Sequence, residues 1–342
     1  MRVTDDAAAQ KTLPHEKKRR VAPSAGRALA ALGAVLLSLA GLLLCWTAVL
    51  CRGPSPAARD LFVTTVMETS AAKFVAHIFF SQQEIEAILA RNAVVDTGVV
   101  TETREFTQPE KEAPLDTIEL VDVSGATFKG KMLIVHDPAR VSVAAAPRFA
   151  ADAQGRRVEE FVENAGAIAG INGGGFADEG GVGKGGLPLG IVISNGELLY
   201  GGLDTACAIV GFDESNMLVV GTLTGRECRE RKIRDAVAFG PAFIVNGQAM
   251  DVAGSGGGMN PRTVLGQRAD GAVLMLVIDG RQPSSLGATY RDCIDVMLEF
   301  DAVNACNLDG GSSSMLVYDG EVRNVCASLY GSRRLPTAFI VK

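Results

Sequence analysis

The stretch Asn307-Leu308-Asp309-Gly310-Gly311-Ser312-Ser313-Ser314 decides how the rest of this sequence is interpreted. Two short apolar runs flank it, at residues 303–306 and 315–318, and both are predicted to be strands. A carboxylate, two glycines and three hydroxyls at a strand end predict a compact loop with room for a ligand, because glycine allows close backbone approach. The same letters also fit a tight Asp-Gly hairpin turn, so the choice depends on the rest of the chain.

Similar polar loops follow two other predicted strands. Residues 171–176 read Ile-Asn-Gly-Gly-Gly-Phe, and residues 277–282 read Val-Ile-Asp-Gly-Arg-Gln. Further β-type runs with turn residues between them occur throughout residues 118–342, and helices are predicted near residues 155–162 and 290–300. The fold class predicted for this region is α+β: a single mixed domain with more strand than helix.

A long uncharged segment lies near the N-terminus. Residues 28–51 consist largely of Ala, Leu, Gly and Val. As a helix, about 24 residues span about 36 Å, which exceeds the roughly 30 Å hydrocarbon core of a bilayer. The Lys/Arg excess of residues 1–27 predicts a cytoplasmic tail, a single membrane crossing and an extracytoplasmic C-terminal domain. A cleaved signal peptide is the alternative, although this apolar run is longer than the usual core of a signal sequence.

Residues 52–117 are predicted to form a helical stalk and linker. Apolar side chains recur at helical spacing over residues 61–90, and Ser81 with Glu84 fits a capping box. Residues 97–112 are polar, β-branched and rich in Glu, which is typical of a linker. The predicted order is therefore a basic tail over residues 1–27, a transmembrane helix over 28–51, a stalk and linker over 52–117, and a globular domain over 118–342.

Charge and composition exclude some classes of function. The net charge of −6 combines seven Lys/Arg against three acids in residues 1–51 with 26 against 36 in the remainder. A body this acidic, with only 6% aromatic residues, is a poor candidate for binding nucleic acid. The sequence contains neither a Walker loop nor a G-x-G-x-x-G motif opening a helix, so nucleotide chemistry has little support.

Histidine and cysteine usage argues against a metal centre. Of the three histidines, only His136 lies in residues 118–342, where a structural role at a strand end is predicted. The seven cysteines contain no C-x-x-C pair, and Cys293 and Cys306 are expected to be small buried side chains. No metal site and no cofactor are predicted, so the chemistry is expected to come from carboxylates and arginines.

Four of these segments, in their order along the chain, resemble one family. They are residues 171–176, Pro261-Arg262-Thr263-Val264-Leu265-Gly266, Asp279-Gly280-Arg281-Gln282 and residues 304–313. Residues 118–342 are similar to the phosphodiester glycosidase domain, a family that includes N-acetylglucosamine-1-phosphodiester α-N-acetylglucosaminidase. Arg333, four residues before Thr337, fits the ending of the family. The first motif departs from the family pattern, because a third glycine precedes the single aromatic residue Phe176.

The resemblance implies hydrolysis of a glycosyl-1-phosphodiester between the anomeric carbon and the phosphate oxygen. A phosphate leaves more easily than an alkoxide, so the main requirement is positive charge around the phosphate. Guanidinium groups present paired donors that fit this anion, and hydroxyls and glycine amides can add neutral donors. The predicted catalytic residues are Asp309, Asp279 and Arg262. The predicted substrate-binding residues are Asn172, Gly173, Arg281, Gly310, Gly311, Ser312, Ser313 and Arg333, with Asn172 on a sugar hydroxyl or N-acetyl group.

Other interpretations of these residues stay open at this point. Each arginine could be an ordinary surface or salt-bridged residue, and Asp279-Gly280 could be a plain turn. A glycan-binding envelope module without turnover would keep the same fold, although it could lose Asn172, Arg262 and the two aspartates freely. A serine hydrolase using Ser312 or Ser313 lacks a G-x-S-x-G elbow. The favoured prediction is a membrane-anchored hydrolase acting on cell-envelope or capsular glycopolymers, with the catalytic residues placed in polar loops outside the core.

Overall fold

The computed structural model describes residues 25–106, 114–178, 183–328 and 331–342. The chain divides into two compact units, Met1–Val49 and Leu50–Lys342. Within the described residues there are seven α-helices and three antiparallel sheets, so the predicted strand-rich α+β class is confirmed. The predicted basic tail lies almost entirely outside the described residues.

The predicted apolar segment forms helix α1, Ala25–Arg52. By length and composition this helix could cross a membrane, a criterion that an N-terminal signal sequence also meets. The predicted stalk comprises three short helices: α2 (Pro56–Met67), α3 (Lys73–Phe79) and α4 (Gln82–Ala90). The capping box of α4 is confirmed, because the Ser81 hydroxyl accepts from the Glu84 amide while the Glu84 carboxylate accepts from the Ser81 amide.

Residues 50–92, here called the helical segment, have a small apolar core of their own. It is formed by Cys51, Val63, Ala76, Phe80, Ile85 and Ile88, all from within the segment. The residues that follow, including the start of the linker expected over residues 97–112, contact the sheet domain. Thr101 is buried and bonded to Val220, and Val94 forms a bridge with Val252. Residues 107–113 of the expected linker lie outside the described residues.

The largest sheet has seven strands and carries three of the four sequence motifs. Each neighbouring pair in it is antiparallel. Its spatial order is β1 (Ile118–Ser124), β2 (Lys129–Val135), β13 (Val273–Ile278), β12 (Arg262–Arg268), β14 (Ala302–Asn307), β10 (Ala242–Val245) and β11 (Gln248–Ala249).

Two five-stranded sheets complete the domain. One has the order β16 (Glu321–Val322), β15 (Leu316–Tyr318), β4 (Ala169–Asn172), β17 (Thr337–Val341) and β3 (Val141–Ala145). The other has the order β6 (Glu197–Tyr200), β5 (Val192–Ser194), β9 (Ile233–Ala238), β7 (Cys207–Asp213) and β8 (Leu218–Leu223).

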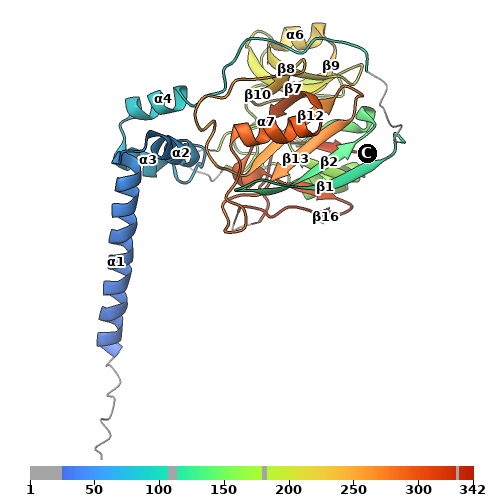
Figure 1. Cartoon of the computed structure of the whole chain (residues 1–342). Coiled ribbons are helices and arrows are strands. Elements are labelled where there is room, and N and C mark those ends of the chain that lie inside the picture. The colour runs from blue at the N-terminus through green and yellow to red at the C-terminus, as the bar shows by residue number, and fades with distance from the viewer. Residues whose placement is uncertain (1–24, 107–113, 179–182, 329–330) are drawn as a thin grey trace, which may run out of the picture. The chain divides into compact units, whose positions relative to one another are not determined.

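The three sheets share one apolar core because their strands alternate between two faces. In β2, Leu133 and Val135 join the shared core, whereas Met132 and Ile134 face the opposite side. The outer faces are covered by helices α7 (Tyr290–Glu299), α5 (Val158–Ala165) and α6 (Gly225–Glu230). Helix α7 packs against β14, β10 and β12, and Figure 1 shows it in front of this sheet. The helix predicted near residues 290–300 is confirmed as α7, which Thr289 caps, with Asp292 completing a capping box.

Antiparallel register brings the motifs to neighbouring strand ends. Arg262, at the start of β12, pairs with Ile278 at the end of β13, and Val264 pairs with Asn307 at the end of β14. The loops beginning at residues 279 and 308 therefore lie beside the first turn of β12. In the neighbouring sheet Ala338 of β17 pairs with Asn172 of β4, which brings residues 333–337 to the glycine loop after β4.

Candidate active site

Asp309 lies in the loop that joins β14 to β15, two strands of different sheets. The hairpin-turn interpretation is therefore wrong, because the flanking strands do not pair with each other. The Asp309 amide donates to the Gly173 carbonyl at 3.3 Å, and its carboxylate accepts from the Gly310 amide at 3.1 Å. Burial of the carboxyl group raises the pKa of Asp309 to about 6, against the lowering effect of Ser313 and Arg333. A carboxyl with this pKa changes charge within the range used by enzymes.

The side chain of Asn172 holds the Asp309 loop in place through hydrogen bonds. Its side chain is fully buried, and its amide nitrogen donates to the Asp309 carbonyl at 2.6 Å. Its amide oxygen accepts from the Thr263 hydroxyl at 2.8 Å and from the Met315 amide at 3.1 Å. These contacts assign Asn172 a positioning role for the Asp309 loop, and its predicted contact with a sugar stays a prediction. Gly173 packs against Thr337 so closely that a Cβ would lie 2.5 Å from its hydroxyl.

Arg262 is buried in the sheet and not in a polar loop, which corrects the expectation from the sequence. It is the first residue of β12 and only 3% exposed. Its guanidinium donates to the carbonyls of Ala288, Gly257 and Gly258 at 3.0, 2.6 and 2.8 Å. The remaining terminal nitrogen donates to the Glu68 carboxylate at 2.5 Å. Arg262 therefore anchors the loop before β12 and offers one edge to an anion.

Arg281 lies beside the Asp309 loop. Its backbone is left-handed, with φ of 58°, and its guanidinium donates to Asn260 and Thr69, both at 2.9 Å. A Cβ on Gly311 would lie 3.0 Å from this guanidinium, and the left-handed φ of 63° at Gly311 favours glycine there. Partial burial and the nearby charge of Arg262 lower the pKa of Arg281, which indicates that two guanidinium groups converge here.

Arg333 joins the C-terminal motif to the other loops. It makes a bidentate ion pair with Asp178 at 2.7 and 3.1 Å and reaches the Ser312 hydroxyl at 3.3 Å. Its guanidinium also lies over the ring of Phe176, 5.2 Å from the centroid. Burial opposes ionisation of Asp178, but the bonds from Arg333 and Gly183 keep its pKa below the ordinary value.

Asp279 is directed away from this network. Its carboxylate accepts from the Val325 amide at 2.8 Å and from Asn324 at 3.4 Å. Burial raises the pKa of Asp279. In this structure Asp279 holds the chain after β16, so its predicted catalytic role stays a prediction. No group of three or more metal-ligating side chains occurs among the residues that the structure describes.

Comparison with known proteins places these motifs in a family. A family model described as phosphodiester glycosidase matches residues 165–342, more than half of the chain. The chain belongs to the phosphodiester glycosidase family. Its family-matched part contains all four motifs quoted from the sequence and the arginine at position 333.

Two relatives illustrate how far the likeness extends. The chain is 29% identical over 169 residues to an uncharacterized protein of the SPbeta prophage in Bacillus subtilis strain 168, YomE. That match covers 46% of this chain and 25% of YomE, so the chain spans about a quarter of the relative's length. The catalytic domain of zebrafish N-acetylglucosamine-1-phosphodiester alpha-N-acetylglucosaminidase, auto-inhibited by its pro-peptide, is similar with a TM-score of 0.56 and 22% identity. This match covers 71% of this chain and 88% of the zebrafish chain, and it shows a common fold.

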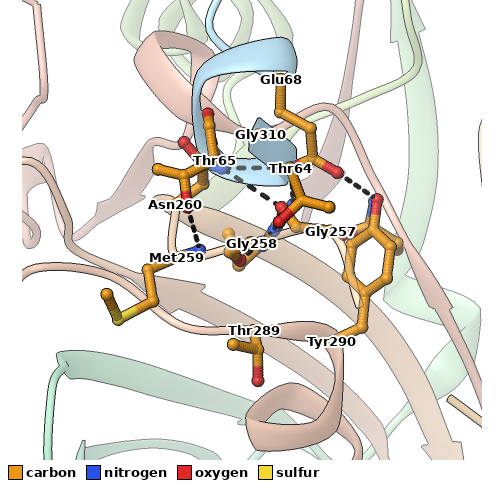
Figure 2. Close-up of polar contacts among 12 residues, drawn as sticks. Thr64, Thr65, Glu68, Gly257, Gly258, Met259, Asn260, Thr289, Tyr290 and Gly310 are labelled. Carbon is orange, nitrogen blue, oxygen red and sulfur yellow. Dashed lines mark hydrogen bonds and ion pairs between the residues drawn. The ribbon is translucent and has the colours of Figure 1, made fainter. Parts of the chain in front are cut away.

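Sequence reasoning missed several residues of the candidate site. Asp178 follows the glycine loop and pairs with Arg333. Three consecutive residues of the helical segment, Glu68, Thr69 and Ser70, contact Arg262, Arg281 and Asp178 respectively. Figure 2 shows Glu68 reaching from the helix toward the hydroxyl of Tyr290. Only an acidic residue close after the glycine loop could have signalled Asp178, and no local pattern marks residues 68–70.

Replacing Asn172 by Ala is expected to weaken the phosphodiester glycosidase domain and its activity together. The change leaves the Asp309 carbonyl, the Thr263 hydroxyl and the Met315 amide without their buried partner, which predicts a loss of about 1–3 kcal/mol in the free energy of unfolding. Urea denaturation and initial rates would be measured beside Asn164→Ala, a change on the exposed surface of α5. Unchanged stability and rate in Asn172→Ala would contradict the positioning role.

Proposed function

We propose that this chain hydrolyses a glycosyl-1-phosphodiester at the bond between the anomeric carbon and the phosphate oxygen. The observation that carries the proposal is a buried carboxyl with a raised pKa, Asp309, in a loop that contacts two converging arginines. Arg281 lies against Gly311 of that loop, and Arg333 bonds to Ser312 in the same loop. Carboxylates beside an arginine fork suit a reaction in which positive charge develops on the sugar while a phosphate leaves.

Each group has a defined part in the proposed reaction. The arginines neutralise the phosphate as the C–O bond breaks, so the leaving group departs with its charge compensated. Above a pH of about 6 the Asp309 carboxylate is ionised. In that form it stabilises the oxocarbenium-like sugar or accepts a proton from the attacking water. The Ser312 hydroxyl, which accepts from Arg333, would donate its own proton to a phosphate oxygen. The amides of Gly310 and Gly311 already donate to the Asp309 carboxylate and to the Pro261 carbonyl, and they shape the loop.

We place the reaction outside the cytoplasm, on a glycan of the cell envelope or capsule. The support is helix α1, which is long and apolar enough for a membrane span, and the excess of Lys/Arg before it. A single-pass anchor of this kind would hold the domain next to envelope glycopolymers linked through sugar-1-phosphates. The substrate proposed is accordingly a glycosyl-1-phosphodiester within or at the end of such a polymer.

Release of free sugar by the full chain in detergent tests the proposal. A panel of sugar-1-phosphodiesters would be offered to the wild type and to Asp309→Asn, with Asp301→Asn as a control, since Asp301 is exposed just before β14. The expected result is sugar release by the wild type and the control, with no release by Asp309→Asn. Binding of glycans by folded protein without release from any compound would favour a glycan-binding module instead.

A further inference from the structure

The carboxylate of Glu68 lies in a set of donors from a distant part of the chain. Glu68 follows the last turn of α2, and it accepts from Arg262 at 2.5 Å and from the hydroxyl of Tyr290 at 2.7 Å. The Asn260 amide nitrogen adds a third, longer contact at 3.3 Å. Figure 2 shows the bond between the Glu68 carboxylate and the Tyr290 hydroxyl as a dashed line. Both oxygens of the Glu68 carboxylate therefore accept hydrogen bonds from side chains that lie about two hundred residues away in sequence.

These donors are held in place without the help of Glu68. Arg262 is fixed by three backbone carbonyls, and its guanidinium lies over the ring of Tyr290, 4.4 Å from the centroid. Tyr290 begins α7, and Asn260 forms a bridge with Ala288. The second guanidinium, that of Arg281, lies next to Asn260. Two neighbouring cations with a hydroxyl and an amide form a preorganised site for an anion.

The residues after Glu68 use further groups of the same site. Thr69 accepts from Arg281 at 2.9 Å, and Ser70 donates to Asp178 at 3.3 Å. Arg281 and the Asp178–Arg333 pair belong to the fork proposed to bind the substrate's phosphate. Glu68 and Thr69 thus occupy two guanidinium groups that a phosphodiester would need, and Ser70 bonds to the carboxylate that pairs with Arg333.

The helical segment is built in a way that permits it to separate from the sheet domain. Its apolar cluster is made only of its own residues, between Cys51 and Ile88. Its contacts around the site are polar: the Thr64 and Ser255 hydroxyls lie 3.0 Å apart, and the Thr65 hydroxyl accepts from the Met259 amide at 3.0 Å. Polar interfaces between parts of one chain are typical of pairs that move relative to each other. Release would leave the small apolar core of the segment intact.

We propose that Arg262, Asn260 and Tyr290 form an anion-binding site for a phosphate group, and that Glu68 fills this site until the phosphate displaces it. The identification of that phosphate as part of the substrate rests on the proposed function. The site itself takes any phosphate monoester, diester or free phosphate ion that offers two anionic oxygens. Asn260 and Tyr290 thereby become phosphate-binding residues, and Glu68 becomes a competitor of the substrate rather than a member of the catalytic set.

Binding of inorganic phosphate to the full chain tests the site without requiring turnover. Calorimetric titration would compare the wild type with Glu68→Ala, Glu68→Gln and a control, Glu86→Ala, which changes an exposed carboxylate on α4. Glu68→Ala is expected to bind phosphate about tenfold to a hundredfold more tightly, the effect of removing one charged hydrogen-bonding competitor. The phosphate affinity of Glu68→Gln is expected to lie between those of the wild type and Glu68→Ala. Equal or weaker binding in both Glu68 variants, with the control unchanged, would overturn the proposal.

An engineered disulfide between the helical segment and the sheet domain tests the displacement of Glu68 in the opposite direction, because it keeps the segment in place. Thr64 and Ser255 have hydroxyls 3.0 Å apart, so a Thr64→Cys/Ser255→Cys pair is placed to form a disulfide that holds the segment down. The oxidised pair is expected to bind phosphate at least tenfold more weakly than the reduced pair. Identical binding in the two redox states, with the disulfide verified by mass, would overturn displacement. Tighter phosphate binding by Glu68→Ala in a chain that cleaves no glycosyl phosphodiester would support the anion site while refuting the proposed function.

Discussion

Asp309→Asn is expected to abolish turnover while making the folded protein more stable at neutral pH. The loss in kcat/KM should be about a thousandfold, because an amide can neither carry the charge that stabilises the sugar nor accept a proton. The amide oxygen still accepts from the Gly310 amide, so the loop keeps its shape. Sugar release and circular dichroism on the same preparation would separate lost chemistry from lost structure.

The stability gain follows from the raised pKa of Asp309. In the unfolded chain this carboxyl has its ordinary pKa of 3.8, whereas burial raises its pKa to about 6 in the fold. The folded state therefore binds its proton more tightly, and this stabilisation is complete below pH 4 and lost as pH rises through about 6. At pH 8 the buried charge costs at most about 3 kcal/mol, which the amide removes.

Urea denaturation at pH 4 and pH 8 measures this effect. Asp309→Asn should exceed the wild type in free energy of unfolding at pH 8 and match it near pH 4. Asp301→Asn, a change of the same kind at an exposed position before β14, should follow the wild type at both values. A stability difference between Asp309→Asn and the wild type that does not change with pH would contradict the burial of an ionised Asp309.

Arg262→Ala is expected to destabilise the protein by about 3–5 kcal/mol, the usual range for breaking a buried ion pair from one side. Alanine removes the guanidinium donors from the carbonyls of Ala288, Gly257 and Gly258 and leaves Glu68 without its cation. The ring of Tyr290 also loses the guanidinium that lies over it. This expected loss of stability follows from the burial of Arg262, which the sequence alone did not reveal.

Thermal and urea unfolding of the full chain would measure the loss beside Arg291→Ala, which changes an exposed arginine of α7. Arg262→Lys keeps the charge but cannot reach several carbonyls with one fork, so it should fall between the wild type and alanine. Phosphate affinity should fall in both Arg262 variants. A folded Arg262→Ala protein with the stability of the wild type would refute the anchoring role of this arginine.

The sequence by itself determined the strand-rich α+β class, the main elements and the family. Apolar alternation marks strands such as β2 and β13, because one residue in two faces each side of a sheet. The caps of α4 and α7 were predictable because a capping box lies within four residues. The glycine loops at strand ends were visible because they are local patterns, and their order along the chain identified the family.

Only the tertiary structure decided how those loops are used. Antiparallel register places Asn172 under Asp309 and buries Arg262 in the sheet, and neither relation appears in a local pattern. The contact of Glu68 with Arg262 joins residues 194 positions apart. Contacts at such separation depend on how strands and helices pack, so the residues next to Glu68 in sequence do not predict them. The motifs therefore indicated which side chains belong to the candidate site, whereas the packing of the chain determined which groups each of them contacts.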